Sequence, residues 1–290
     1  MTRLFDLAYH QWLALSVANR IRKRSAPRRY VCTDYPSRPH RLGVLAIMKN
    51  ESHLIEEWIE HNLWIGADRI FLIDNGSTDD TIARLKPWLD RGQVELVVYP
   101  EQHRQVQHYW TAINEFRLAE RCEWLLNCDI DEFFFCKSGE SLADFVTRQT
   151  RFDVIYVNGA IFGTSGHASQ PASVRAELTM RTPRLSRFTK CIFRPSVPTK
   201  ASDLDVHFIW NTPRGRSLIA NRDLQFNHYV TQSRHYWFDV KMQRGDVRYS
   251  KVNLDAWAKR YQLIEATSTE RSTRLRDLLA QAQAADVKAD

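Results

Sequence analysis

The chain has 290 residues, of which 43% are hydrophobic, 26% charged and 11% aromatic, and its formal net charge is +7 at pH 7. This ordinary globular composition can bury a core without disulfides or structural metals, in one large domain or two small ones. The basic balance suits nucleic acid, anionic lipid or phosphate-bearing small molecules. No zinc-finger spacing, RNP-like motif or helix-turn-helix occurs in the sequence, so we expect no nucleic-acid partner.

The five cysteines are an odd number, and none of them shows the C-x-x-C spacing of a zinc site. This pattern favours a reduced, intracellular protein. No apolar run approaches the roughly 18 to 20 residues that span a bilayer. The expected location is therefore the cytoplasm, either free or peripheral at the inner face of the membrane.

Residues 1–41 predict an amphipathic helix followed by a basic linker. Apolar residues recur at about helical spacing as far as Ile21. The bases of this segment are Arg20, Arg22, Lys23, Arg24, Arg28 and Arg29. Because they follow the apolar part and no clear cleavage site occurs, the segment does not resemble a signal peptide. Two interpretations stay open: the helix packs on the main domain, or it contacts an anionic membrane surface.

From residue 42 to about 150, the hydrophobic pattern alternates between strands and helices. Apolar runs typical of buried strands are LGVLAIM (42–48), RIFLID (69–74), VELVVY (94–99) and EWLLN (123–127), the last leading into a loop. The segments between them repeat apolar residues at helical spacing. This alternation predicts an α/β fold with a mainly parallel sheet flanked by helices.

After residue 150 the pattern changes to shorter strands and longer loops. TKCIF and VHFIW are typical of short strands, and we expect antiparallel additions to the sheet in this half. The last segment is polar and helical, with RLRDLLAQAQAA as its clearest helix. The expected division is therefore an N-terminal helix and linker (1–41), a main domain (42–252) and a helical tail (253–290).

Three carboxylates interrupt two apolar runs in the stretch LLNCDIDEFFF: Asp129, Asp131 and Glu132. In parallel sheets ligands bind beyond the carboxyl ends of strands, where this stretch is expected to lie. Side chains alternate along a strand, so Asp129 and Asp131 point to one side while Ile130 points into the core. Two such carboxylates repel each other unless a cation lies beside them, and Mg²⁺ or Mn²⁺ prefers oxygen ligands together with substrate phosphates. The alternative is a solvated turn that caps a helix.

The motifs KNESHLIEEWIEHNLWIGADRIFLIDNGSTDDT, DIDEFFF, FGTSGH and NHYVTQSRHYWFDVKMQRG occur in this order. Together they resemble the glycosyltransferase family 2-like and family 92-type group, over roughly residues 42 to 250. The resemblance implies a GT-A fold, which is Rossmann-like, a nucleotide-diphosphate sugar donor and a divalent metal, Mn²⁺ or Mg²⁺, held at the D-x-D motif.

Carried over position by position, the resemblance implies a set of donor and metal residues. Asn50 and Glu51 are placed near the nucleotide, and Asp74 and Asn75 near the base and ribose. The family usually has a second acid where this chain has Asn75, which leaves the base contact in doubt. Asp129 and Asp131 match the D-x-D pair, with Asp129 also on the donor side, and Glu132 matches the acid that follows.

The later motifs supply further candidates. His228 is the predicted third metal ligand, with His207 as a competitor and a buried core histidine as the alternative. Lys241 and Arg244 are predicted to bind the diphosphate, unless they belong to a solvated basic face. His167 is predicted to contact a sugar hydroxyl, unless its segment is a plain flexible loop. Trp210 and Trp237 are expected in the core rather than under a sugar ring.

Sugar transfer to a hydroxyl needs a general base in an inverting enzyme, usually a carboxylate. Asp205 is favoured, with Asp203 and Glu177 as alternatives. The predicted function is therefore a metal-dependent glycosyltransferase of the hexosyltransferase type that uses a nucleotide-diphosphate sugar, expected to be UDP-linked. The expected acceptor is a glycan or glycolipid, by resemblance in cell-surface polysaccharide or lipopolysaccharide biosynthesis. The rivals are a nucleotidyltransferase, which would normally have a glycine-rich loop after the first strand, and a non-catalytic binder of anionic lipid or nucleic acid.

Overall fold

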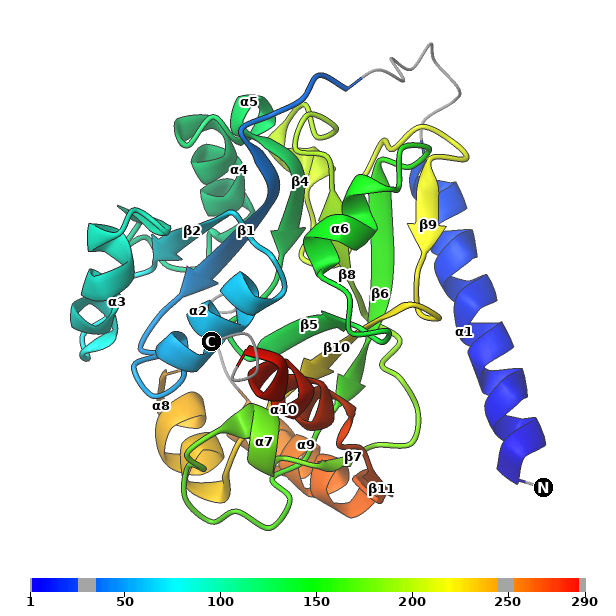
Figure 1. Ribbon diagram of the computed structural model, residues 1–290. Helices are drawn as coiled ribbons and strands as arrows, with labels where there is room; N and C mark the ends of the chain where they lie inside the picture. Colours follow the sequence, from blue (N-terminus) through cyan, green and yellow to red (C-terminus); the bar gives the residue numbers. More distant parts are fainter. Residues whose placement is uncertain (1, 26–34, 245–252, 287–290) are drawn as a thin grey trace.

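The computed structural model describes residues 2–25, 35–244 and 253–286, and shows a large mixed sheet with helices on both faces (Figure 1). The sheet has the strand order β3-β2-β1-β4-β8-β6-β10-β5, and β9 pairs with β6 outside this path. The bounds of the first four strands are β1 His40–Met48, β2 Arg69–Asp74, β3 Val94–Val98 and β4 Cys122–Asn127. These four strands pair in parallel, as the alternating sequence pattern predicted.

The second half of the sheet adds the antiparallel strands that we expected. Its strands are β5 Glu132–Cys136, β6 Val154–Ile161, β8 Thr189–Phe193, β9 Ser217–Ile219 and β10 Leu224–His228. β8 runs antiparallel to both β4 and β6, and β10 runs antiparallel to β5. β7 Met180–Arg181 and β11 Glu270–Arg271 form a separate two-stranded sheet. The predicted α/β class, with a parallel half and antiparallel additions, is confirmed.

Two apolar cores lie on opposite faces of the sheet, because alternate residues of β1 point to opposite sides. Val44 and Ala46 join the core that includes side chains of α2 Ile55–Trp64, α3 Thr81–Asp90 and α6 Leu142–Thr147. Leu45 and Ile47 join the core that includes side chains of α4 Gln105–Glu115, α5 Leu118–Arg121 and α1 Thr2–Arg24. The later helical segments are α7 Val174–Glu177, η1 Ala201–Asp203, η2 Tyr236–Lys241, α8 Met242–Arg244, α9 Leu254–Thr267 and α10 Arg274–Asp286.

The N-terminal helix α1 packs along the β9 side of the sheet (Figure 1). Its residues Leu13 and Val17 are buried. Arg20 donates a hydrogen bond to the carbonyl of Arg187 at 2.6 Å, and the guanidinium of Arg24 lies 4.4 Å from the ring centre of Trp210. Both bases therefore face the protein, as the first of our two interpretations of this segment expects. The predicted basic residues Arg28 and Arg29 and the cysteine Cys32 lie outside the described residues.

One strand prediction was wrong. The run VHFIW, residues 206–210, forms turns, with only an isolated bridge between Leu204 and Ile209. Val206, Phe208 and Ile209 are nonetheless buried, and Arg20 and Arg24 both lie over the ring of Phe208. Phe208 and Ile209 are thus buried by packing against α1 and a face of the sheet, and not by pairing as a strand. Hydrophobicity alone cannot distinguish these two kinds of burial.

The four cysteines in the described ranges, Cys122, Cys128, Cys136 and Cys191, are buried and free. Among the described helices, none combines the length and the apolar character that crossing a bilayer requires. The domain limits at residues 41 and 252 stay a prediction.

His61 gives the fold a dependence on pH. It is fully buried on α2 and donates from Nε2 to the carbonyl of Phe134 at 2.7 Å, and burial lowers its pKa from 6.5 to about 3. As pH falls, His61 is therefore protonated in the unfolded chain before it is protonated in the folded protein. Its contribution to the free energy of unfolding is complete above pH 6.5 and is lost as pH falls toward 3. Going from pH 7 to pH 5 should cost the wild type up to about 2 kcal/mol through this group.

Urea unfolding at the two pH values checks this prediction. His61→Gln should shrink the difference between them, whereas His235→Gln, at an exposed position, should leave it unchanged. An unaltered pH dependence in His61→Gln would show that other groups cause it.

Candidate functional site

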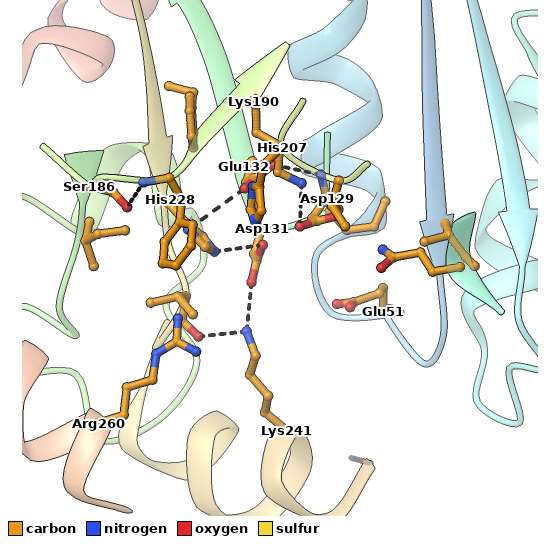
Figure 2. Close-up of a pocket in the computed structure, with 18 of the residues that line it drawn as sticks. Glu51, Asp129, Asp131, Glu132, Ser186, Lys190, His207, His228, Lys241 and Arg260 are labelled. Carbon is orange, nitrogen blue, oxygen red and sulfur yellow. Dashed lines mark hydrogen bonds and ion pairs between the residues drawn. The ribbon is translucent and has the colours of Figure 1, made fainter. Parts of the chain in front are cut away.

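A cavity of about 440 Å³ lies where β1 and β4 end and where β8 and β10 approach them (Figure 2). The residues that line it come from the ends of β1 and β4, from β8 and β10, and from the η2, α8 and α9 helices. Its charged walls hold the acids Glu51, Asp129, Asp131 and Glu132 and the bases Lys49, Lys190, Lys241, Arg244 and Arg260. The position, beyond the carboxyl ends of parallel strands, is the one where α/β sheets bind ligands.

The acid cluster, which we define as Asp129, Asp131 and Glu132, lies at the junction of β4 and β5. Glu132 is the first residue of β5, and its side chain accepts a hydrogen bond from the backbone N–H of Asp129 at 2.9 Å. Ile130 is buried, as expected, although D-I-D lies in the turn between β4 and β5 and not in a strand. The cluster lies at the edge of the cavity, and Ile130 contributes to the cavity lining beside it.

Asp131 lies between a histidine and a lysine. Its Oδ1 is 3.3 Å from Nε2 of His228, and its Oδ2 accepts from Nζ of Lys241 at 2.8 Å (Figure 2). His228 is brought there by β10, because it pairs directly with Glu132 in the β5–β10 register. Burial would raise the pKa of Asp131, but Lys241 and His228 hold it well below its usual value. Asp131 is thus ionised, and the predicted metal ligand His228 and the predicted phosphate-binding residue Lys241 both converge on it.

Lys190 lies on the other side of the cluster, and our sequence analysis did not single it out. It is 1% exposed on β8, and its Nζ lies 2.7 Å from Oδ2 of Asp129 and 3.1 Å from Oε2 of Glu132. Burial would lower the pKa of Lys190, but the two carboxylates raise it well above its usual value. Burial raises the pKa of Glu132, and Lys190 offsets only part of that effect. The sequence feature that could have identified Lys190 is that it is the single charged residue in the otherwise uncharged strand TKCIF.

Glu51 and Arg244 form the opposite wall. The Arg244 guanidinium pairs with Oε1 of Glu51 and donates to the carbonyl of Lys49 at 2.8 Å. Burial raises the pKa of Glu51, and Arg244 opposes this. Oε2 of Glu51 is buried and accepts no hydrogen bond from the described residues. The site therefore contains an acceptor that a ligand hydroxyl or N–H can use.

Three of the predicted nucleotide residues do not line the cavity and instead shape the neighbouring loops. Asn50 accepts from the N–H of Thr78 at 2.7 Å, and Asp74 accepts from the N–H groups of Gly76 and Ser77. Asn75 is fully buried and donates to two carbonyls that follow β3. Their predicted contacts with a base or ribose stay predictions.

The predicted base and sugar contacts also lie outside the cavity lining. Asp205 accepts from the backbone N–H of His207 at 3.0 Å, whereas His207 itself lines the cavity. Asp203 is buried and caps the segment around Thr199. Nε2 of His167 lies 3.8 Å from Oε2 of Glu177. The roles predicted for Asp205 and His167 stay predictions.

The site provides part of a divalent-metal shell. The carboxylate of Asp131 and the imidazole of His228 converge, and the partly exposed carboxylate of Asp129 lies nearby on the same loop. Within the described residues, no group of three or more histidine, cysteine, aspartate or glutamate side chains is arranged to hold a metal alone. Mg²⁺ and Mn²⁺ commonly use one or two carboxylates and complete their shell with phosphates. These residues therefore fit a metal that binds together with a phosphate ligand.

An α/β sheet with an acid cluster and cations at its carboxyl edge is the arrangement of an enzyme that binds a phosphorylated ligand. Residues 45–270 match the family model of glycosyltransferase family 92. The chain belongs to this family, as the resemblance of its motifs predicted.

Curated relatives that bear the name of the same family are similar to this chain. A glycosyltransferase family 92 protein of Ricinus communis is 28% identical over 202 residues, covering 67% of this chain and 36% of the relative. One of Arabidopsis thaliana is 27% identical over 215 residues, with the same coverage. The chain thus spans about a third of the length of these relatives.

Among solved structures, S. aureus TarS in complex with UDP-GlcNAc has a TM-score of 0.45 at 12% identity, covering 83% of this chain and 70% of that one. GalNAc-T7 with UDP, GalNAc and Mn²⁺ has a TM-score of 0.43 at 11% identity, covering 69% and 46%. Because both TM-scores are below 0.5, no feature of the site is inferred from them.

Proposed function

We propose that this protein transfers a sugar from a nucleotide-diphosphate sugar, UDP-linked by resemblance, to a hydroxyl of a glycan or glycolipid acceptor. The observation that carries the proposal is the convergence of Asp131, His228 and Lys241 in one cavity, in a chain of glycosyltransferase family 92. Acids that could share a cation and bases that could bind phosphate oxygens are what a diphosphate leaving group requires.

The proposed metal is Mn²⁺ or Mg²⁺, held by Asp131 and His228, with Asp129 beside them. When bound, it would neutralise the charge that develops on the departing diphosphate. Lys241 and Arg244 would bind phosphate oxygens, since their side chains line the same cavity. Their present partners, Asp131 and Glu51, keep these cations in place before a ligand arrives.

The nucleotide is proposed to lie at the Glu51 end of the cavity. Oε2 of Glu51 accepts no hydrogen bond from the described residues and lies 3.8 Å from Nε2 of His53, and Lys49 and Gln105 line the same cavity. The predicted residues Asn50, Asp74 and Asn75 would then act by fixing the loops that surround the nucleotide. A carboxylate acceptor is suited to a ribose hydroxyl or a base N–H.

The acceptor hydroxyl must lose a proton during an inverting transfer, which is the stereochemistry that the resemblance implies. Asp205 is the proposed base, with His167 as a proposed sugar contact, although neither side chain lines the cavity described above. Cell-surface polysaccharide or lipopolysaccharide biosynthesis is the proposed pathway. A membrane contact through α1 would use its exposed Trp12 and Leu15, since Arg20 and Arg24 face the protein.

The test is nucleotide release from a panel of UDP-, GDP- and CMP-linked sugars, with Mn²⁺ and with a chelator. We expect metal-dependent release from one nucleotide class, rising when a suitable glycan acceptor is added. Release of pyrophosphate from a nucleoside triphosphate and a sugar phosphate would instead indicate a nucleotidyltransferase. No turnover of any donor, with lipid or nucleic-acid binding intact, would favour the non-catalytic alternative.

A further inference from the structure

The acid cluster already contains two cations of the chain itself. The ammonium of Lys241 lies 2.8 Å from Asp131, and that of Lys190 lies 2.7 Å from Asp129 and 3.1 Å from Glu132. We propose that Lys241 stands in for the divalent cation at Asp131, and that the cation enters only together with the nucleotide diphosphate, when Lys241 leaves Asp131. The proposal rests on the proposed function and adds an order of binding to it.

Lys241 is the lysine that is free to move. It holds one carboxylate and one backbone carbonyl, that of Val230 at 3.1 Å, and it ends a π-helical turn. Such turns are frequent at functional sites. Its side chain is 13% exposed at the cavity wall, so its ammonium can turn toward a ligand without crossing the core (Figure 2).

Lys190 is fixed by comparison. It is 1% exposed, it lies on a strand between β4 and β6, and it is paired with two carboxylates. Moving it would leave Glu132 buried without its cation, which is costly. Lys190 therefore keeps Asp129 and Glu132 neutralised in both states, and the exchange takes place at Asp131.

A cation alone meets an unfavourable site. It would have to displace or approach the Lys241 ammonium, and like charges at such distances repel. The described residues also supply too few protein ligands for a complete shell. A diphosphate removes both obstacles, because it contributes oxygen ligands to the metal and a new partner for Lys241.

The charge of the cavity supports the same order. Five cationic side chains line it against four carboxylates, so the unliganded walls carry no negative excess to attract a free divalent ion. A nucleotide diphosphate brings several negative charges, which can satisfy a divalent cation and the released lysine together. The pair is therefore favoured over either ion alone.

The experiment measures Mn²⁺ binding to the full chain by the EPR signal of free Mn²⁺, with and without UDP. Wild type should bind Mn²⁺ weakly alone and at least about tenfold more tightly with UDP present. Lys241→Met should bind Mn²⁺ alone at least about tenfold more tightly than wild type does. Lys86→Met is the matched control: Lys86 also pairs with a carboxylate, Asp90 at 2.8 Å, but it is exposed and does not line the cavity, so the Mn²⁺ affinity should stay within about threefold.

Equal affinities of wild type and Lys241→Met for Mn²⁺ alone would overturn the proposal. Equal affinities of wild type for Mn²⁺ with and without UDP would also overturn it. Lys241→Gln serves as a second variant should Lys241→Met fail to fold. If UDP affects no variant, the donor site itself fails, whereas the comparison made with Mn²⁺ alone still tests the role of the lysine.

Discussion

Asp131→Asn should reduce nucleotide-sugar turnover by at least about 100-fold. The change removes the charge that His228 and Lys241 converge on and that a metal would need, while it keeps the shape of the side chain. Folding should be nearly intact, with a melting temperature only a few degrees lower, because Lys241 is partly exposed and can turn to water. Turnover of the best donor and thermal unfolding are measured on the same preparation.

The control for this prediction is Asp144→Asn. Asp144 also pairs with a cation, Arg41 at 2.8 Å, but both side chains are exposed and neither lines the cavity. Its turnover should equal that of wild type. If Asp131→Asn instead lost stability in proportion to activity, the acid cluster would be a structural element and the proposed metal site would be wrong.

Lys190→Met should be the most destabilising of the single changes considered, at a cost of about 3 kcal/mol. The change removes a fully buried cation from its two carboxylate partners. Of these, Glu132 is buried, whereas Asp129 is partly exposed. Adding Glu132→Gln should restore at least about 1 kcal/mol, because the uncompensated carboxylate is then gone. Urea unfolding of the two single variants and the double variant gives the coupling between the two residues.

Lys86→Met is the matched surface control. Lys86 pairs with Asp90 at 2.8 Å, a distance similar to that of Lys190 and Asp129, but both members of this pair are exposed. The expected cost is below about 1 kcal/mol. A similar cost for both lysines would mean that burial of Lys190 does not determine its contribution.

Local features of the sequence were enough for the parallel half of the sheet and for the acid cluster. Strand-length apolar runs separated by helical periods define parallel units, and ligand residues gather where those strands end. Ile130 is buried as expected, but it lies in the turn between β4 and β5, so its burial does not follow from the alternation of a strand.

Long-range register was not predictable from the sequence. His228 reaches Asp131 because β10 pairs with β5, and the two residues are almost 100 positions apart in the chain. Lys190 reaches the cluster because β8 lies next to β4 and antiparallel to it. The hydrogen bonds that Asn75 donates to carbonyls after β3 were not predictable either, since turn geometry decides which way such a side chain points.

The central claim is that the cavity at the acid cluster binds a nucleotide diphosphate together with a divalent cation. The most direct measurement is the melting temperature of the full chain with UDP, GDP or CMP, each with and without Mn²⁺, because a ligand of the folded state must raise it. The account predicts a clear rise with one nucleoside diphosphate that needs Mn²⁺ and that Asp131→Asn abolishes. No rise with any nucleotide, or an identical rise in Asp131→Asn, would contradict it.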